Sequence, residues 1–237
     1  MLAAKQGGAT RIELCSALSD GGVTPSIGVI KAAIATGIPG INVLVRPRPG
    51  DFLYSDEEIS IMIKDIESAV IAGATGIVIG ALDKFGNIDF KTTHQLIIAA
   101  KEINPDINIT FHRAFDLSND ALKSLDTVIS LGCNCLLTSG MASSALAGKE
   151  TLKQLVERAE KKIVIMAGGG INPDNAREII DYANVDAIHA SARSLIKSDM
   201  IFHREELSMG VPENDEYCRL STDSRIVNNL IKIALNL

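Results

Sequence analysis

Residue types that commonly carry out chemistry recur at alternate positions of short, strand-like segments in this chain. Four of them stand out: Glu13, Cys15, His112 and His189. In the segments that contain them, branched apolar residues fill the opposite parity, and alternate residues of a β-strand face the same side of a sheet. A carboxylate beside an imidazole can act as acid and base. We therefore predict that Glu13 and His112 are catalytic.

Each of these residues also has a purely structural explanation. Cys15 on an apolar strand could be a small, inert core thiol, and otherwise it points into the barrel near its mouth, where nearby cations would stabilise a thiolate. Glu13 on an inward face needs a partner because a lone buried carboxylate is costly, and Arg11 or another arginine could satisfy it. A single histidine is commonly a satisfied core residue, but two at equivalent strand ends favour a functional site.

A second set of residues predicts that the same region binds a small anion. Consecutive glycines after a strand let backbone N–H groups approach a ligand, and arginines add fixed positive charge. A hydroxyl or carboxylate at a neighbouring strand end can orient the ligand. The predicted anion-binding residues are Arg46, Arg48, Asp51, Arg113, Asp116, Ser139, Gly168, Gly169, Gly170, His189 and Ser191.

The elements that must position these residues alternate regularly between strand and helix. Strands are predicted near 10–15, 41–46, 75–80, 107–112, 133–139, 163–167 and 185–191, and helices near 25–36, 56–73, 91–102, 119–131, 146–161, 173–183 and 222–235. Such alternation predicts a parallel sheet. With polar groups on one strand face, it predicts an α/β protein of the TIM (β/α)₈ type in one domain, residues 1–237, whose polar face lies inside the barrel.

Only seven of the eight expected strands are visible in the sequence. The chain opens on residues 2–8, which have the pattern of a helix tail that leads into the strand at Arg11. We therefore expect a barrel with two unpaired edges, and we favour an incomplete sequence as the reason. The stretch between Lys197 and Thr222 is predicted to be irregular.

Composition and charge narrow the classes of partner. The net charge is −6 and no block of lysine or arginine occurs, which argues against nucleic acid. No apolar run reaches membrane-spanning length and no signal peptide is recognisable, so we expect a cytoplasmic protein that is also small enough to enter the nucleus. The four cysteines show no metal-binding or disulfide spacing and are predicted to be free thiols.

Several motifs strongly resemble the CutC family and occur in family order over nearly the whole chain. They are Arg11-Ile12-Glu13-Leu14-Cys15-Ser16, Arg46-Pro47-Arg48, Thr110-Phe111-His112-Arg113-Ala114-Phe115-Asp116, Met166-Ala167-Gly168-Gly169-Gly170 and His189-Ala190-Ser191-Ala192-Arg193. The resemblance implies a TIM-barrel fold, a role in copper homeostasis, copper binding by some members and association into homo-oligomers. Family members begin with a strand that carries a Glu-x-Cys motif, and this strand is missing here.

The resemblance attributes copper coordination to cysteines of the first two strands, and only the second, matching Cys15, is present. It therefore implies Cys15 as a ligand for Cu(I), with His112, His189 or Met166 needed to complete the site. The residues themselves favour a different function, a metal-independent barrel enzyme that acts on a small phosphorylated or carboxylated metabolite. Copper homeostasis is the function we assign, and the enzyme is the alternative.

Overall fold

The centre of the molecule is a curved sheet of parallel strands. The computed structural model describes residues 1–204, 206–207 and 216–236. Its seven strands neighbour one another in chain order: β1 (Arg11–Leu14), β2 (Gly40–Leu44), β3 (Gly76–Ile79), β4 (Asn108–Phe111), β5 (Cys135–Thr138), β6 (Val164–Gly168) and β7 (Ala187–His189). This order is that of a (β/α) barrel. The predicted fold class, with seven strands, is confirmed.

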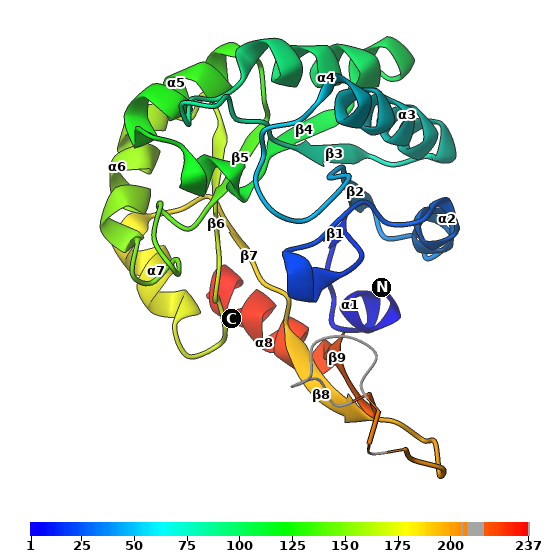
Figure 1. The fold of residues 1–237 in the computed structure, drawn as a ribbon. Helices are drawn as coiled ribbons and strands as arrows, with labels where there is room; N and C mark the ends of the chain where they lie inside the picture. The colour runs from blue at the N-terminus through cyan, green and yellow to red at the C-terminus, as the bar shows by residue number, and fades with distance from the viewer. Residues whose placement is uncertain (205, 208–215, 237) are drawn as a thin grey trace.

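Helices lie on the convex side of this sheet and alternate with the strands, as Figure 1 shows. They are α2 (Ile27–Ile34), α3 (Asp56–Ala72), α4 (Phe90–Ile103), α5 (Ala121–Ser130), α6 (Lys149–Ala159) and α7 (Ala176–Ala183). Helix α3 begins at Asp56 and is capped by Ser55, whose side chain accepts from the Glu58 N–H while the Glu58 side chain accepts from the Ser55 N–H. None of the described helices is long and apolar enough to cross a membrane.

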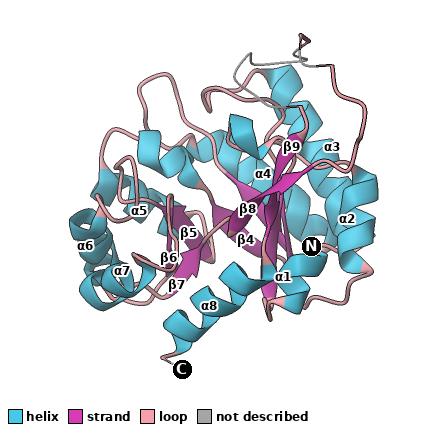
Figure 2. Cartoon of the chain, turned by 90° about the horizontal axis from the view of Figure 1, so that it is seen from below, coloured by secondary structure: helices cyan, strands magenta, loops and turns pink. Residues whose placement is uncertain are grey.

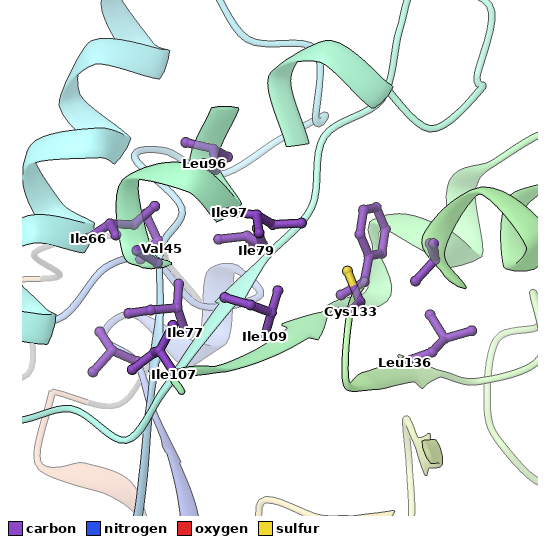
Figure 3. Packing of buried hydrophobic residues seen from close by; sticks show 14 of the residues in the cluster. Val45, Ile66, Ile77, Ile79, Leu96, Ile97, Ile107, Ile109, Cys133 and Leu136 are labelled. Carbon is purple, nitrogen blue, oxygen red and sulfur yellow. The ribbon is translucent and has the colours of Figure 1, made fainter. Parts of the chain in front are cut away.

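The main hydrophobic core fills the space between the sheet and these helices. Figure 3 shows Ile77 and Ile79 of β3 packed toward Ile66 of α3 and Leu96 and Ile97 of α4. These side chains are almost fully buried. Because they hold the outward parity of their strands, the intervening residues must point into the barrel. The alternation seen in the sequence is therefore the alternation between core and barrel interior.

The barrel interior is organised in layers by the strand register. Gly168 is paired with His189, and continuing the register of β3 and β4 by one residue sets Gly80 beside His112. A Cβ atom on Gly80 would lie 2.5 Å from His112 Nδ1, so no larger residue fits there without displacing the imidazole. In both pairs a glycine on one strand leaves room for an imidazole on the next strand.

The sheet is open between β1 and β7, which form its two edges. Helix α1 (Leu2–Gln6) precedes β1, and α8 (Ser224–Leu235) ends the described chain. The two helices pack together beside the opening (Figures 1 and 2). Contact is close at Gly7, where a Cβ atom would lie 2.6 Å from Val227 Cβ. The helical layer is therefore continuous where the strand layer is not.

The prediction of an irregular stretch between Lys197 and Thr222 is wrong in part. Strand β8 (Arg193–Lys197) pairs antiparallel with β9 (Cys218–Thr222) in a separate sheet. This hairpin extends away from the barrel in Figure 1. Cross-strand pairs such as Leu195 with Leu220 supply its register, a long-range match that local sequence patterns do not reveal. Residues 205 and 208–215 of the predicted stretch lie outside the described residues.

Candidate functional site

Glu13 and His189 meet across the open side of the sheet. Glu13 points inward from β1, and His189 ends β7. His189 Nε2 lies 3.4 Å from Glu13 Oε2, and the two side chains are 34% and 16% exposed. Both residues were predicted for the site on parity alone, and the structure brings them together as one pair. Glu13 also has Arg11 and His112 within electrostatic range.

The two members of this pair stabilise each other's charged forms. Burial works to raise the pKa of Glu13, but His189, with smaller contributions from His112 and Arg11, lowers it below its ordinary value. Burial works to lower the pKa of His189, but the facing Glu13 carboxylate raises it. An opposite charge at this distance favours both ions. The pairing therefore favours a carboxylate facing an imidazolium over the neutral forms of both groups.

Cys15 follows β1 on the same inward parity and is half-buried. Burial raises the pKa of its thiol, the nearby Glu13 carboxylate raises it further, and Arg193 acts in the opposite direction. Cys15 Sγ would lie 3.5 Å from a Cβ atom built on Gly22, in the loop that follows β1. The thiol is thus protonated at neutral pH, and it lies at the edge of the site rather than in its centre.

His112 occupies the end of β4, where it caps the short helix η2 (Arg113–Leu117). Its Nδ1 accepts a hydrogen bond of 3.1 Å from the Ala114 N–H, and the residue is only 5% exposed. The Phe52 ring covers it at a centroid distance of 5.0 Å. Burial lowers the pKa of His112 to about 4, and Glu13 opposes this shift only partly. His112 is accordingly a neutral imidazole at pH 7.

A second polar cluster joins η2 to the loop after β5. Asp116, whose side chain is 7% exposed, accepts bonds from the Thr138 hydroxyl, the Ser139 N–H and hydroxyl, and the Met141 N–H. It also pairs with Arg113 Nε at 2.7 Å. The predicted residues Arg113, Asp116 and Ser139 are therefore adjacent. Because its oxygens are occupied by protein donors, Asp116 orients Arg113 rather than facing a ligand itself.

The glycines after β6 lie against this cluster. A Cβ atom on Gly169 would be 3.1 Å from Ser139 Cβ and 3.2 Å from Arg113 Cζ. Gly169 and Gly170 also have φ angles of +103° and +74°, values that glycine adopts most readily. Gly168 lies beside His189. The predicted glycine turn therefore borders both Arg113, whose side chain is 43% exposed, and the Glu13–His189 pair.

Arg46 lies inside the protein instead of at the mouth opening. It is 6% exposed, its Nη1 donates to the carbonyls of Asp20 and Gly22, and its Nη2 donates to the Gly50 carbonyl. Its guanidinium also stacks over the Phe52 ring at 4.9 Å. These contacts fasten the loop after β1 to the loop after β2, so Arg46 is a positioning residue for both loops.

Arg48, Asp51 and Ser191 are placed away from the paired site residues. Arg48 bonds Glu58 and Asp51 on the outer side of its loop. Asp51 is exposed, and the exposed Ser191 offers its carbonyl to the Thr222 hydroxyl near the hairpin. These three side chains share the mouth end of the barrel with the site but do not join its hydrogen-bond network.

The sequence reasoning did not assign a role to Gly80 or use Phe52 as a cover for His112. The inward parity of Gly80 was readable from its strand, since it continues the alternation after Val78. The contact of Phe52 with His112 was not readable, because it depends on how the loop after β2 folds over β4. A cavity of about 150 Å³ was also missed; it lies at the opposite end of the barrel among Arg11, Asn42, Asn108 and Asn134.

The described residues hold no cluster of three or more His, Cys, Asp or Glu side chains placed to bind a metal ion. Met166, which the resemblance implied as a further copper ligand, accepts a contact from Arg11 Nη2 at 3.1 Å. His189 is engaged by Glu13, and His112 turns Nδ1 to the backbone. Cys15 is therefore not joined by a ready set of ligands within the described chain.

Comparison with known proteins places these features in a family. The model of the CutC family matches residues 1–194. A human protein named copper homeostasis protein cutC homolog is 43% identical over 235 residues, which cover 99% of this chain and 85% of the human protein. A CutC protein from Vibrio campbellii is 43% identical over 97% of this chain and 92% of its own length.

Solved structures agree with the sequence comparisons. The crystal structure of a CutC protein from Streptococcus agalactiae superposes with a TM-score of 0.71 at 35% identity, covering 76% of this chain and 87% of that protein. An aldolase superposes with a TM-score of 0.59 at 18% identity over 79% of each chain, a likeness that concerns the fold alone. The matched family model, the high identity and the high coverage show that this chain belongs to the CutC family.

Proposed function

We propose that this chain acts in copper homeostasis, the role named for its human relative, with Cu(I) as its cargo. The observation that carries a direct role is Cys15, a half-buried thiol at the mouth of the barrel. Thiolate is a preferred ligand type for Cu(I). Cys15, Cys133 and Cys135 are free thiols, which supports action in a reducing compartment such as the cytoplasm.

The state of the thiol determines how copper would bind. Because burial and Glu13 raise the pKa of Cys15, Cu(I) must displace a proton, and its affinity should rise with pH. The described residues do not supply a complete ligand set. Cys15 would therefore anchor a Cu(I) complex that arrives with soft ligands of its own, such as a small thiol.

Self-association is part of this proposal. Strands β1 and β7 leave two sheet edges without a strand partner in the described chain. Open edges of this kind favour contact with another chain. The hairpin also exposes apolar side chains, among them Leu195 and Leu220. Sedimentation at several protein concentrations would test the proposal, and a monomer throughout would reject a homo-oligomer.

The first experiment is a Cu(I) competition with a chelator under reducing conditions. Cys15→Ser should lose Cu(I) binding, while Cys218→Ser, which alters a half-buried thiol on the hairpin, should keep it. Equal binding by wild type and Cys15→Ser would reject Cys15 as the anchor. No binding by any of the three proteins would reject copper as a direct ligand.

A second candidate function is a metal-independent reaction on a small phosphorylated or carboxylated metabolite. It is favoured by the arrangement of the Glu13–His189 pair, the neutral His112 and the partly exposed Arg113 at one end of the barrel. The mouth of a barrel is the usual place of catalysis in this fold. Thermal-shift screening with phosphorylated and carboxylated metabolites tests it, with Arg113→Gln expected to abolish any stabilisation.

A further inference from the structure

The interior of the barrel contains a buried ring nitrogen, His112 Nε2, that has no hydrogen-bond partner in the described part of the chain. His112 Nε2 is fully buried, yet none of the described residues bonds to it. Its other nitrogen, Nδ1, is occupied by the Ala114 N–H. A buried polar atom without a partner costs on the order of 1 to 3 kcal/mol, so it is rarely retained without a reason.

The bond to Ala114 also determines where the proton of the ring lies. A backbone N–H can only donate, so Nδ1 must carry the lone pair. A neutral imidazole has one N–H, which must then be on Nε2. Burial keeps the ring neutral at pH 7 by lowering the pKa of His112 to about 4. His112 is thus held as one tautomer with an N–H that faces no acceptor in the described chain.

The surroundings maintain this state from several sides. Gly80 has no side chain and so leaves room for Nδ1 and Cε1 of the His112 ring. The Phe52 ring lies over the His112 ring at a tilt. Burial has the largest effect on the pKa of His112 and lowers it; among the charges, Glu13 raises this pKa most, Arg46 lowers it, and Asp116 raises it less. A hydrophobic cover and a nearby cation are a general means of keeping an imidazole neutral.

The charged groups at the same end of the barrel indicate what this donor would contact. Arg113, the next residue, directs its guanidinium toward Ser139 and the glycine turn. His189 is paired with Glu13. Arg113 is likewise paired with Asp116, but that carboxylate is occupied by several further protein donors, so Arg113 retains attraction for an added anion. A ligand with negatively charged oxygens suits this set of donors.

We propose that His112 is a ligand-binding residue that donates its Nε2–H to an oxygen of a small oxyanion, a phosphate or carboxylate, whose charge is held by Arg113 and the Gly169 turn. This rests on the second candidate function and assigns its binding chemistry. His112 acts as a neutral donor, and so it differs from the acid or base predicted from the sequence. In this role His112 neither accepts nor releases a proton, and Glu13 remains the group able to accept one.

The first test reads the tautomer directly, without a ligand. Two-dimensional ¹⁵N–¹H NMR of the histidine side chains at pH 7 should show His112 protonated at Nε2 only. Phe52→Ala, which removes the cover, should move the pKa of His112 upward toward the ordinary value. An imidazolium at pH 7, or a proton on Nδ1, would overturn the proposal whatever the protein binds.

The second test uses inorganic phosphate as the probe, with affinity measured by calorimetry at constant ionic strength. His112→Leu removes the donor and should weaken phosphate binding about tenfold, the effect of one hydrogen bond. His112→Gln offers an amide N–H and should restore most of the affinity. His94→Leu, which replaces an exposed histidine on α4, is the matched control and should bind as wild type does.

The outcomes separate the inference from the function on which it rests. Phosphate binding that requires Arg113 but is unchanged in His112→Leu would overturn the role of His112 and leave the second candidate function standing. Absence of phosphate binding by wild-type protein at millimolar concentration would overturn the oxyanion site and the second candidate together. Loss of binding in His112→Leu with recovery in His112→Gln would support the proposal.

Discussion

Glu13 of β1 and His189 of β7 are linked by a distance of 3.4 Å between their charged atoms, although their strands are opposite edges of the sheet. The backbone is not paired at this place in the described chain, so side chains make the connection between the two edges. The Glu13–His189 pair is part of the candidate site, and it is also a contact between the first and last strands of the sheet. Changing it should therefore affect both function and stability.

Replacing His189 with Gln should destabilise the protein in a pH-dependent way. Because the pKa of His189 is raised in the folded state, the ion pair contributes its full stabilisation below a pH of about 6.5, the pKa of histidine in the unfolded chain. This stabilisation is lost as the pH rises through the pKa of His189 in the folded state. The variant should lose at most about 1 kcal/mol of unfolding free energy near pH 6, because the pair is partly exposed, and this difference should vanish at high pH. Urea unfolding across this range measures it. A difference that grows above pH 8 would contradict the assigned charges.

His112→Gln should instead reduce the sensitivity of the protein to acid. The folded pKa of His112 is about 4, below the unfolded value, so its neutral form stabilises the protein above about pH 6.5 and this stability is lost as the pH falls toward 4. Between pH 7 and pH 4.5 the free energy of unfolding of the wild type should fall by about 2 to 3 kcal/mol more than that of the variant. Denaturant unfolding at the two pH values measures this difference. Equal losses in both proteins would contradict a neutral, buried His112.

Arg46→Ala should destabilise the protein strongly, because Arg46 serves three backbone carbonyls from the interior. Leaving these acceptors without partners should cost about 2 to 4 kcal/mol. Arg48→Ala is the matched control, because Arg48 also donates to three backbone carbonyls and pairs with Asp51 and Glu58, but from a side chain that is 35% exposed. Water can replace those bonds, so its loss should cost less than that of Arg46. Thermal melting of both variants distinguishes them, and equal melting temperatures would refute the interior role of Arg46.

Asp116→Asn should loosen the loop after β5. Oδ1 of Asp116 accepts from the Thr138 hydroxyl and the Met141 N–H, whereas Oδ2 accepts from Arg113 Nε and the Ser139 hydroxyl. The amide keeps only one acceptor oxygen, so it cannot serve both sets of donors. We expect a loss of about 2 to 3 kcal/mol in unfolding free energy. Asp126→Asn, at an exposed pair with Arg158, should change it by less than about 1 kcal/mol. A loss no larger for Asp116→Asn than for Asp126→Asn would show that the network contributes little.

Much of the fold could be predicted because its signals are local. Alternation of two along each strand and the caps of the helices are properties of neighbouring residues, so the element order and the polar inner face were readable. The hairpin was missed because its strands are separated by a long stretch and pair through residues such as Leu195 and Leu220. Its register exists only once the two segments meet.

By itself the sequence determined which side chains enter the barrel, including Glu13, Cys15 and His112, since parity along a strand decides this. Only the tertiary structure decided what each of them contacts. It paired Glu13 with His189, turned Arg46 toward backbone carbonyls, and left His112 Nε2 without an acceptor among the described residues. The reason is physical: hydrogen bonds and pKa values depend on atoms within a few ångströms, and residues far apart in the chain supply those atoms.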